Sequence, residues 1–365
     1  MSTLRPRAAL TSTLLAAALV TGVLCGSPAQ AITGDAANDG AFAFTARLDI
    51  GNGARACSGY LRGTTNTSIN QGKDGVVGTM EKGDRFGTSV AASPEHLAVG
   101  TPHEAIGEKT DAGAVQILAH KVTGGFPTPL VDADQNDSAL TISGSAETGD
   151  QFAHALSMTS HRTVAGNSTA ATESVLAIGV PGEALETDIK EGGRVVTVKI
   201  TAAGKAAQLD DLSQAPADII GTPEAGDRFG QQVAAVSTAP GAVATTSNAL
   251  LAVGVPGEDV GTATNSGSLI AFSLLGNAGD REQAVEPGTF GLPGTPGANQ
   301  KVGTNLHATG AHLYLGMPNG PTTYGAVHTV PWANITSGAT DAVTTYEPGK
   351  GGLPAAGVNF GAVIR

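Results

Sequence analysis

Carboxylate side chains recur at fixed places in this sequence, and carboxylates serve proteins as acid–base groups and as ligands for hard cations. One set lies in the motif Gly-Asp-x-Phe and consists of Asp84, Asp150 and Asp227. A second set lies two residues after a Pro and consists of Glu104, Glu183 and Glu258. A catalytic group is needed once per active site, whereas these acids recur along the chain. A structural role is therefore the favoured interpretation, and acids of a catalytic site are the alternative.

Both sets belong to a repeated unit. The segments Asp74–Ala92 and Ala217–Ala235 share the letters GDRFG, and Ala139–Ser157 carries the variant GDQFA. Phe290–Ala308 is a weaker copy, and Gly351–Arg365 repeats only the start of the unit. The Phe of the motif and its equivalents follow one another at steps of 66, 77 and 73 residues, at Phe86, Phe152, Phe229 and Val302.

Each unit is expected to contribute about four short β-strands. In the first unit these are residues 86–92, 96–102, 113–119 and the segment before the next Gly-Asp. The runs are β-branched and bounded by Gly or Pro, and the chain holds 51 Gly with only 14% charged residues, which is typical of strands joined by turns. A four-stranded unit of this size cannot bury both faces alone, so its neighbours must stack on it. The sequence therefore predicts an all-β fold, a β-propeller of four recognisable blades plus a closing fragment.

The repeated letters resemble the FG-GAP repeat, the blade unit of integrin α-subunit propellers and of many secreted bacterial proteins. The resemblance covers residues 72–365, in units of about 72–137, 138–215, 216–286 and 287–347 with a closing fragment at 348–365. It implies a non-enzymatic binding protein in which the repeated positions are structural. Those positions are Asp84, Phe86, Gly87, Pro102, Asp150, Phe152, Pro181, Asp227, Phe229, Gly230, Pro256, Pro318, Phe360 and Gly361.

The motif Gly-Asp-x-Phe-Gly also has a direct physical interpretation. Gly83 and Asp84 suit a tight turn in which the Asp carboxylate accepts hydrogen bonds from backbone N–H groups. Phe86 is expected to fill the gap between adjacent blades, and Gly87 permits close backbone approach. A ring closed by the C-terminal fragment is the favoured arrangement, and an open arc with exposed edges is the alternative.

FG-GAP repeats often carry a D-x-D-x-D-G calcium site, because a hard cation needs several oxygens from one short loop. The corresponding loops here, such as Ser93–Leu97, hold no paired Asp, so the family's calcium sites are not expected. An acidic run elsewhere is a weak calcium candidate, with a solvated turn as the favoured alternative. Its candidate ligands are Asp132, Asp134, Asn136 and Asp137. No other cofactor is expected.

Residues 1–31 are expected to form a secretory signal peptide. Arg5 and Arg7 precede an apolar stretch, and Ala29-Gln30-Ala31 is a small-x-small cleavage pattern. The chain is therefore expected to be secreted and extracellular, with the cell wall as one location. Glycosylation sequons, which matter only in a glycosylating host, lie at Asn66, Asn136, Asn167 and Asn334.

Residues 32–71 resemble the start of a trypsin-like serine protease. Ile32-Thr33-Gly34 takes the place of the family's new N-terminus, a hairpin is expected to turn at Asn52-Gly53, and Cys57 stands where the family has a disulfide-bonded Cys. The family's catalytic His and Ser segments are missing, so no catalytic residue is carried over. The unpaired Cys57 is either a small buried hydrophobe or the remainder of a lost disulfide.

The net charge of the chain limits the classes of partner that can be expected. The formal net charge is −12, and loss of Arg5 and Arg7 with the signal peptide makes it −14, which argues against nucleic acid and anionic membranes. The favoured function is a secreted, non-enzymatic binding or adhesion module for a protein or carbohydrate partner. Acidic loops at 103–113, 182–193 and 257–267 are expected to cluster on one side. The alternatives are a degenerate protease fusion, an unrecognised propeller hydrolase, and a non-functional remnant or purely scaffolding domain.

Overall fold

The structure is a computed structural model of the chain. It describes residues 42–44, 67–73, 75–123, 126–137, 140–166, 171–185, 188–215, 219–277, 281–322, 324–355 and 359–364. These residues form an all-β, propeller-like fold with four antiparallel four-stranded sheets. The described helix is a single short one, α2 at Trp332–Ser337. The expected all-β class with four four-stranded units is thus confirmed.

Each sheet is a meander in which strands that follow one another in the chain are paired. Sheet 1 consists of β3 Ser89–Ala92, β4 His96–Thr101, β5 Ala114–Thr123 and β6 Phe126–Ala133. Sheet 2 consists of β7 Ala155–His161, β8 Glu173–Val180, β9 Arg194–Ile200 and β10 Ala206–Leu212. Sheet 3 consists of β11 Val233–Ser237, β12 Ala249–Val255, β13 Ser268–Ser273 and β14 Gln283–Val285. Sheet 4 consists of β15 Asn305–Ala308, β16 His312–Met317, β17 Ala326–Pro331 and β18 Thr344–Tyr346.

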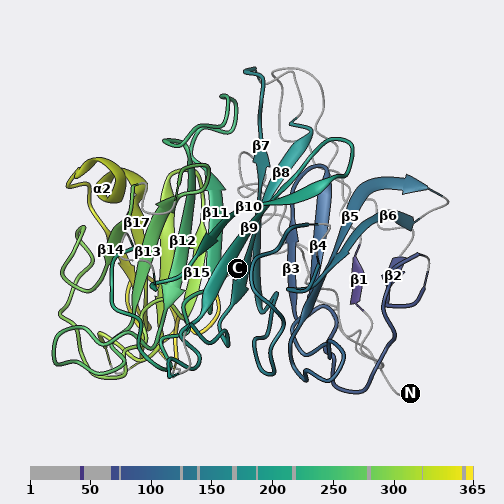
Figure 1. Cartoon of the computed structure of the whole chain (residues 1–365). Coiled ribbons are helices and arrows are strands. Elements are labelled where there is room, and N and C mark those ends of the chain that lie inside the picture. The colour runs from purple at the N-terminus through teal and green to yellow at the C-terminus, as the bar shows by residue number, and fades with distance from the viewer. Residues whose placement is uncertain are drawn as a thin grey trace, which may run out of the picture.

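The sheets stack face to face in chain order. The first strands of neighbouring sheets contact one another, β3 with β7, β7 with β11 and β11 with β15. Figure 1 shows sheet 1 on the right, sheet 2 in the middle, and sheets 3 and 4 overlapping on the left. Separate apolar cores fill the gaps between sheets 1 and 2, sheets 2 and 3, and sheets 3 and 4. The described residues therefore form an open stack and not the closed or nearly closed propeller that the sequence favours, because their substantial contacts between sheets join only consecutive sheets.

The second strand of each sheet shows how the sequence sets this order. A Leu in that strand faces the preceding sheet, and the next residue faces the following sheet because side chains alternate along a strand. The Leu residues are Leu97, Leu176, Leu251 and Leu313, and the residues after them are Ala98, Ala177, Ala252 and Tyr314. The small Ala leaves room for the next sheet. In sheet 4 the large, half-buried Tyr314 takes its place, on a face that no described sheet covers.

The two ends of the stack are finished differently. The outer face of sheet 1 packs against Ile69 and Val76, which join Leu97, Val99 and Leu118 in a small apolar cluster. At the other end, the C-terminal fragment docks on sheet 4 through a hydrogen bond from the Phe360 N–H to the Tyr324 carbonyl (2.8 Å). The closing fragment thus continues the stack onto sheet 4, as the start of a further unit would.

The N-terminal predictions mostly concern other residues. The described pairing there joins β1 Phe42–Phe44 with β2 Thr67–Ile69. The expected signal peptide, the turn at Asn52-Gly53, Cys57 and the sequons at Asn66 and Asn167 lie outside the described residues. Within the described part of the chain, no helix is long and apolar enough to cross a membrane.

The sequon at Asn334 is closed to glycosylation by burial. Asn334 is 1% exposed, and its Nδ2 donates to the carbonyls of Phe290 and Asp341. An attached glycan would replace one of the two Nδ2 hydrogens and so break one of these bonds at a buried position. Asn136, by contrast, is exposed.

Candidate functional site

The Gly-Asp turn has the expected geometry in every unit. The Asp carboxylate accepts the backbone N–H of the residue three positions earlier, at 2.5 Å for Asp84, 2.6 Å for Asp150 and 2.6 Å for Asp227. In the fourth unit Gln300 stands at this position, and its Oε1 accepts the Gly297 N–H at 3.0 Å. An amide oxygen can therefore replace the carboxylate in the turn.

The FG and GAP motifs meet between neighbouring units. A Cβ added to Gly179, the first residue of a GAP motif, would lie 2.0 Å from the carbonyl oxygen of Gly230, in the FG motif of the next unit. The same approach brings Gly254 to Gly303 and Gly316 to Gly361, at 1.9 Å and 2.0 Å. These glycines are required because two backbones touch there, so both motifs are devices for stacking units.

The Phe of each FG motif fills the space between units where two units enclose it. Phe152 and Phe229 are both 0% exposed. Phe229 also packs edge-on against Phe272, with ring centroids 6.2 Å apart. Phe86 and Phe360 occupy the two ends of the repeat and are only half-buried. The Pro residues of the GAP motifs, Pro102, Pro181, Pro256 and Pro318, follow the second strands; the first three are buried and Pro318 is half-buried.

Beside each Asp turn lies the Glu that follows the GAP Pro. The residue before that Glu donates its N–H to the Asp carbonyl, Gly182 to Asp150 and Gly257 to Asp227, each at 3.0 Å. A buried Gln then donates its Nε2 to the Glu carboxylate, at 2.7 Å from Gln71 to Glu104, 2.5 Å from Gln135 to Glu183 and 2.8 Å from Gln214 to Glu258. Three acid–amide clusters result: cluster 1 (Gln71, Asp84, Glu104), cluster 2 (Gln135, Asp150, Glu183) and cluster 3 (Gln214, Asp227, Glu258).

The fourth unit has lost both acids of the cluster together. Gln300 replaces the Asp, and Gly320 stands where the other units have the Glu. A Cβ at Gly320 would lie 3.0 Å from Cγ of Gln300, so the missing side chain leaves room for the longer Gln. The Asp of the turn and the Glu after the Pro are therefore present together in units 1 to 3 and absent together in unit 4.

Burial shifts the pKa of several of the cluster acids. Loss of hydration raises the pKa of Asp150 to about 7, of Asp227 to about 6 and of Glu258 to about 7. It also raises the pKa of Glu104 and Glu183. The carboxylates of a cluster repel each other, which adds to the shift.

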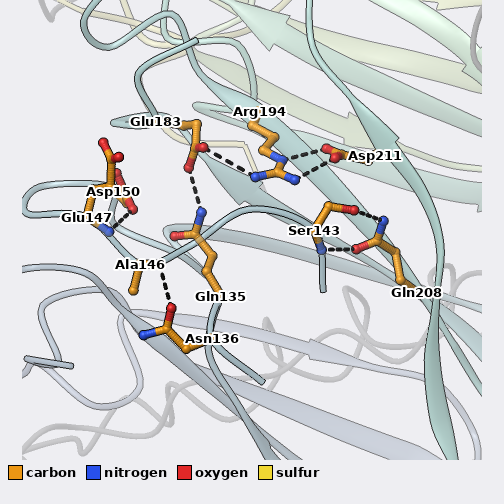
Figure 2. A network of polar contacts seen from close by, with 10 residues as sticks. All are labelled: Gln135, Asn136, Ser143, Ala146, Glu147, Asp150, Glu183, Arg194, Gln208 and Asp211. Carbon is orange, nitrogen blue, oxygen red and sulfur yellow. Dashed lines mark hydrogen bonds and ion pairs between the residues drawn. The ribbon is translucent and has the colours of Figure 1, made fainter. Parts of the chain in front are cut away.

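Cluster 2 contains a cation supplied by the chain itself, as Figure 2 shows. Arg194 is 6% exposed, lies 3.2 Å from Glu183 and forms a bidentate pair with Asp211. The equivalent positions in the other sheets, after the Gly that precedes the third strand, are Ala114, Ser268 and Ala326. Clusters 1 and 3 thus have no arginine at the corresponding place.

Two of the cluster amides are incompletely bonded. Oε1 of Gln135 and Oε1 of Gln214 are buried and have no hydrogen-bond partner among the described residues. Figure 2 shows that the Gln135 amide nitrogen donates to Glu183, while the amide oxygen lies on the side that faces Asp150. Sequence reasoning found the acids but missed these Gln residues, because their spacing to the repeated motif is not constant. They lie 7, 9 and 7 residues before the Gly residues at 78, 144 and 221.

The acidic run proposed for calcium covers the end of β6 and the turns that follow it. Asp132 accepts from Gln116 (2.5 Å), Asp134 accepts the Asn136 N–H (2.6 Å), Asn136 accepts the Ala146 N–H (3.0 Å) and Asp137 accepts the Leu140 N–H (3.2 Å). Within the described ranges, no group of three or more His, Cys, Asp or Glu side chains is arranged to hold a metal ion.

One buried serine–histidine contact lies between sheets 1 and 2. Nδ1 of His96 is 2.8 Å from Oγ of Ser174, which is 2.7 Å from Oγ of Ser93. All three side chains are at most 3% exposed, and burial with the nearby His120 lowers the pKa of His96 to about 4. A buried hydroxyl without a carboxylate to orient its imidazole is not a nucleophile for a substrate. The contact therefore links two sheets.

Comparisons with known proteins assign no family. No protein-family profile matches the sequence, and no curated protein matches it significantly. Among solved structures, the crystal structure of Saccharomyces cerevisiae Sqt1 is similar over 71% of this chain and 85% of that chain, at 10% identity and a TM-score of 0.22. A likeness of that size carries no argument, and the fold assignment rests on the sheets described above.

Proposed function

We propose that the chain is a secreted, non-enzymatic repeat protein of the FG-GAP kind that binds an extracellular protein or carbohydrate. The observation that carries the proposal is the position of the loops between the second and third strands. Each loop lies against the Gly-Asp turn of the next unit: the Gln151 N–H donates to the Asp111 carbonyl, and the Arg228 N–H to the Glu191 carbonyl, both at 2.9 Å. The loops therefore share one end of the stack, called here the loop face (Figure 1).

The loop face has the character of a recognition surface. Its loops carry exposed charged residues at Glu108, Asp111, Asp188, Glu191 and Asp259. Backbone hydrogen bonds to the neighbouring unit hold the loops in place, so few degrees of freedom would be lost on binding. Loops on a rigid β-scaffold are the usual place for binding residues. The alternative of a hydrolase has less support, because the described Ser–His contact is buried.

Binding is tested with the secreted protein on arrays of extracellular-matrix proteins and cell-wall glycans. The variant D111N/E191Q/D259N removes three charges from the loop face, and E95Q removes one charge from the opposite end. We expect a shared ligand for the wild type and E95Q, and at least about tenfold weaker binding by the triple variant.

Three results would overturn the proposal. The first is equal binding by the triple variant, and the second is no binding to any arrayed component. The third is turnover of peptide or ester substrates by the wild-type protein, which would show an enzyme.

A further inference from the structure

We infer that cluster 3 (Gln214, Asp227, Glu258) binds one divalent cation of the hard, oxygen-preferring kind, with Ca²⁺ as its representative. The proposal does not depend on the binding function proposed above. It starts from the chemistry of the cluster, where two carboxylates and a side-chain amide supply oxygen ligands only. Ca²⁺ takes such ligands from Asp, Glu and Asn or Gln side chains, and completes its shell with water.

Hydrogen bonding in cluster 3 leaves one oxygen on each side chain without a partner. Asp227 uses Oδ2 to accept the Glu224 N–H, and Glu258 uses Oε2 to accept from Gln214. Oδ1 of Asp227 and Oε1 of Glu258 accept no hydrogen bond from the described residues. These two atoms and Oε1 of Gln214 are the candidate ligands.

Gln214 is the independent indication of a ligand. Its side chain is 2% exposed, and its Oε1 is buried without a partner. A buried acceptor left unpaired costs about 1–3 kcal/mol, so a native protein rarely keeps one without a partner such as an ion or water. The amide that carries this oxygen is fixed inside the cluster, because its Nε2 is bonded to Glu258 at 2.8 Å.

Comparison between the units shows what the ion would do. In cluster 2 the Glu is already neutralised by Arg194, at 3.2 Å from Glu183. Unit 4 has neither acid and needs no cation. Clusters 1 and 3 both keep their acids and have Ala114 and Ser268 at the position of Arg194. The buried amide oxygen without a partner among the described residues occurs at Gln135 and Gln214, so among the three clusters only cluster 3 combines such an oxygen with the lack of an arginine. A bound cation supplies there the positive charge that the guanidinium supplies in cluster 2.

The site is expected to be weak. Within the described residues no group of three or more carboxylate, His or Cys side chains could hold a metal, and affinity for Ca²⁺ falls as fewer charged ligands take part. We therefore expect a dissociation constant in the weakest range of protein calcium sites, about 10⁻⁴ to 10⁻³ M.

The test measures Ca²⁺ binding to the full-length secreted protein by isothermal titration calorimetry and by thermal unfolding, at pH about 7.5 and constant ionic strength, with Ca²⁺ up to about 10 mM. The variants are E258Q and D227N. Both keep the shape of the side chain, and the Gln at position 300 shows that an amide maintains the turn. The control is D134N/D137N, which disables the rival acidic run.

We expect about one Ca²⁺ per wild-type chain, with a melting temperature that rises with Ca²⁺ concentration. E258Q and D227N should fold but show neither effect, and D134N/D137N should behave as the wild type does. Any of these results overturns the inference: no Ca²⁺ response in the wild type, binding that survives in both cluster variants, or binding that is lost in D134N/D137N. A wild-type protein stabilised by acidification but not by Ca²⁺ also overturns it, because protons alone would then neutralise the cluster.

Discussion

Replacing Phe229 with Ala tests whether the FG motif holds neighbouring units together. The side chain is 0% exposed, belongs to the core between sheets 2 and 3, and packs edge-on against Phe272. Truncation of a buried Phe to Ala costs about 3–5 kcal/mol, from the lost transfer energy and the cavity that remains. Phe86 occupies the same position in the first unit but is only half-buried. Because a neighbouring sheet covers Phe86 on one side only, Phe86→Ala should lower the free energy of unfolding by about 1–2 kcal/mol.

The measurement is urea-induced unfolding of the wild type and the two variants. Circular dichroism follows all four sheets, while fluorescence of Trp332, the single Trp of the chain and 3% exposed, follows sheet 4. In a stack whose units stabilise their neighbours, the loss of packing between sheets 2 and 3 should lower the urea concentration at the unfolding midpoint for both probes. The reasoning is refuted if the two substitutions cost the same, or if Phe229→Ala costs less than about 1 kcal/mol.

Three further substitutions test the polar network, the buried acids and the backbone contact. Arg194→Met should lower the free energy of unfolding in urea by about 3 kcal/mol, because it leaves a buried carboxylate unpaired. Its control, Arg228→Met, breaks an ion pair whose side chains are about half exposed and should cost less than about 1 kcal/mol. Equal losses of stability in the two variants would contradict this. Asp150 has a pKa of about 7 in the folded state, above its ordinary value, so the folded state holds a proton that the unfolded state has released. The free energy of unfolding that this proton contributes is lost as pH rises from about 4 to about 7. Asp150→Asn should flatten the fall in unfolding free energy across that window, and an unchanged slope would count against the burial argument. Gly254→Ala places a Cβ 1.9 Å from a backbone oxygen of the next unit and should cost at least about 1–3 kcal/mol; Gly310→Ala, with its nearest neighbour at 3.4 Å, should change stability by less than about 0.5 kcal/mol.

The local features of the repeat could be predicted because they are encoded over a few residues. The turn at Asp84 needs only the Asp and an N–H three residues earlier, and the strands follow from short apolar runs between Gly and Pro. The close backbone approach at Gly230, Gly303 and Gly361 follows from the same motif. These properties recur with each copy, so each copy supports the prediction from the others.

The acid–amide clusters could be predicted only in part. Asp227 and Glu258 stand in repeated motifs, but nothing local shows that Gln214 reaches Glu258 across 44 positions. The role of Arg194 was also hidden, since it appears in one unit and pairs with two acids of the same unit. Tyr314 did carry a readable signal, because it breaks the Leu-Ala pattern at the end of the stack.

The sequence by itself determined the repeat, the four-stranded unit and the turn chemistry, because periodic side-chain patterns and positive-φ glycines act through near neighbours on the chain. Only the tertiary structure decided that the described units form an open row, that the C-terminal fragment docks on sheet 4, and that each Asp, Glu and Gln meet. Those outcomes depend on contacts between segments dozens of residues apart. Loops of unequal length change the spacing of such contacts from unit to unit, so no fixed interval in the sequence records them.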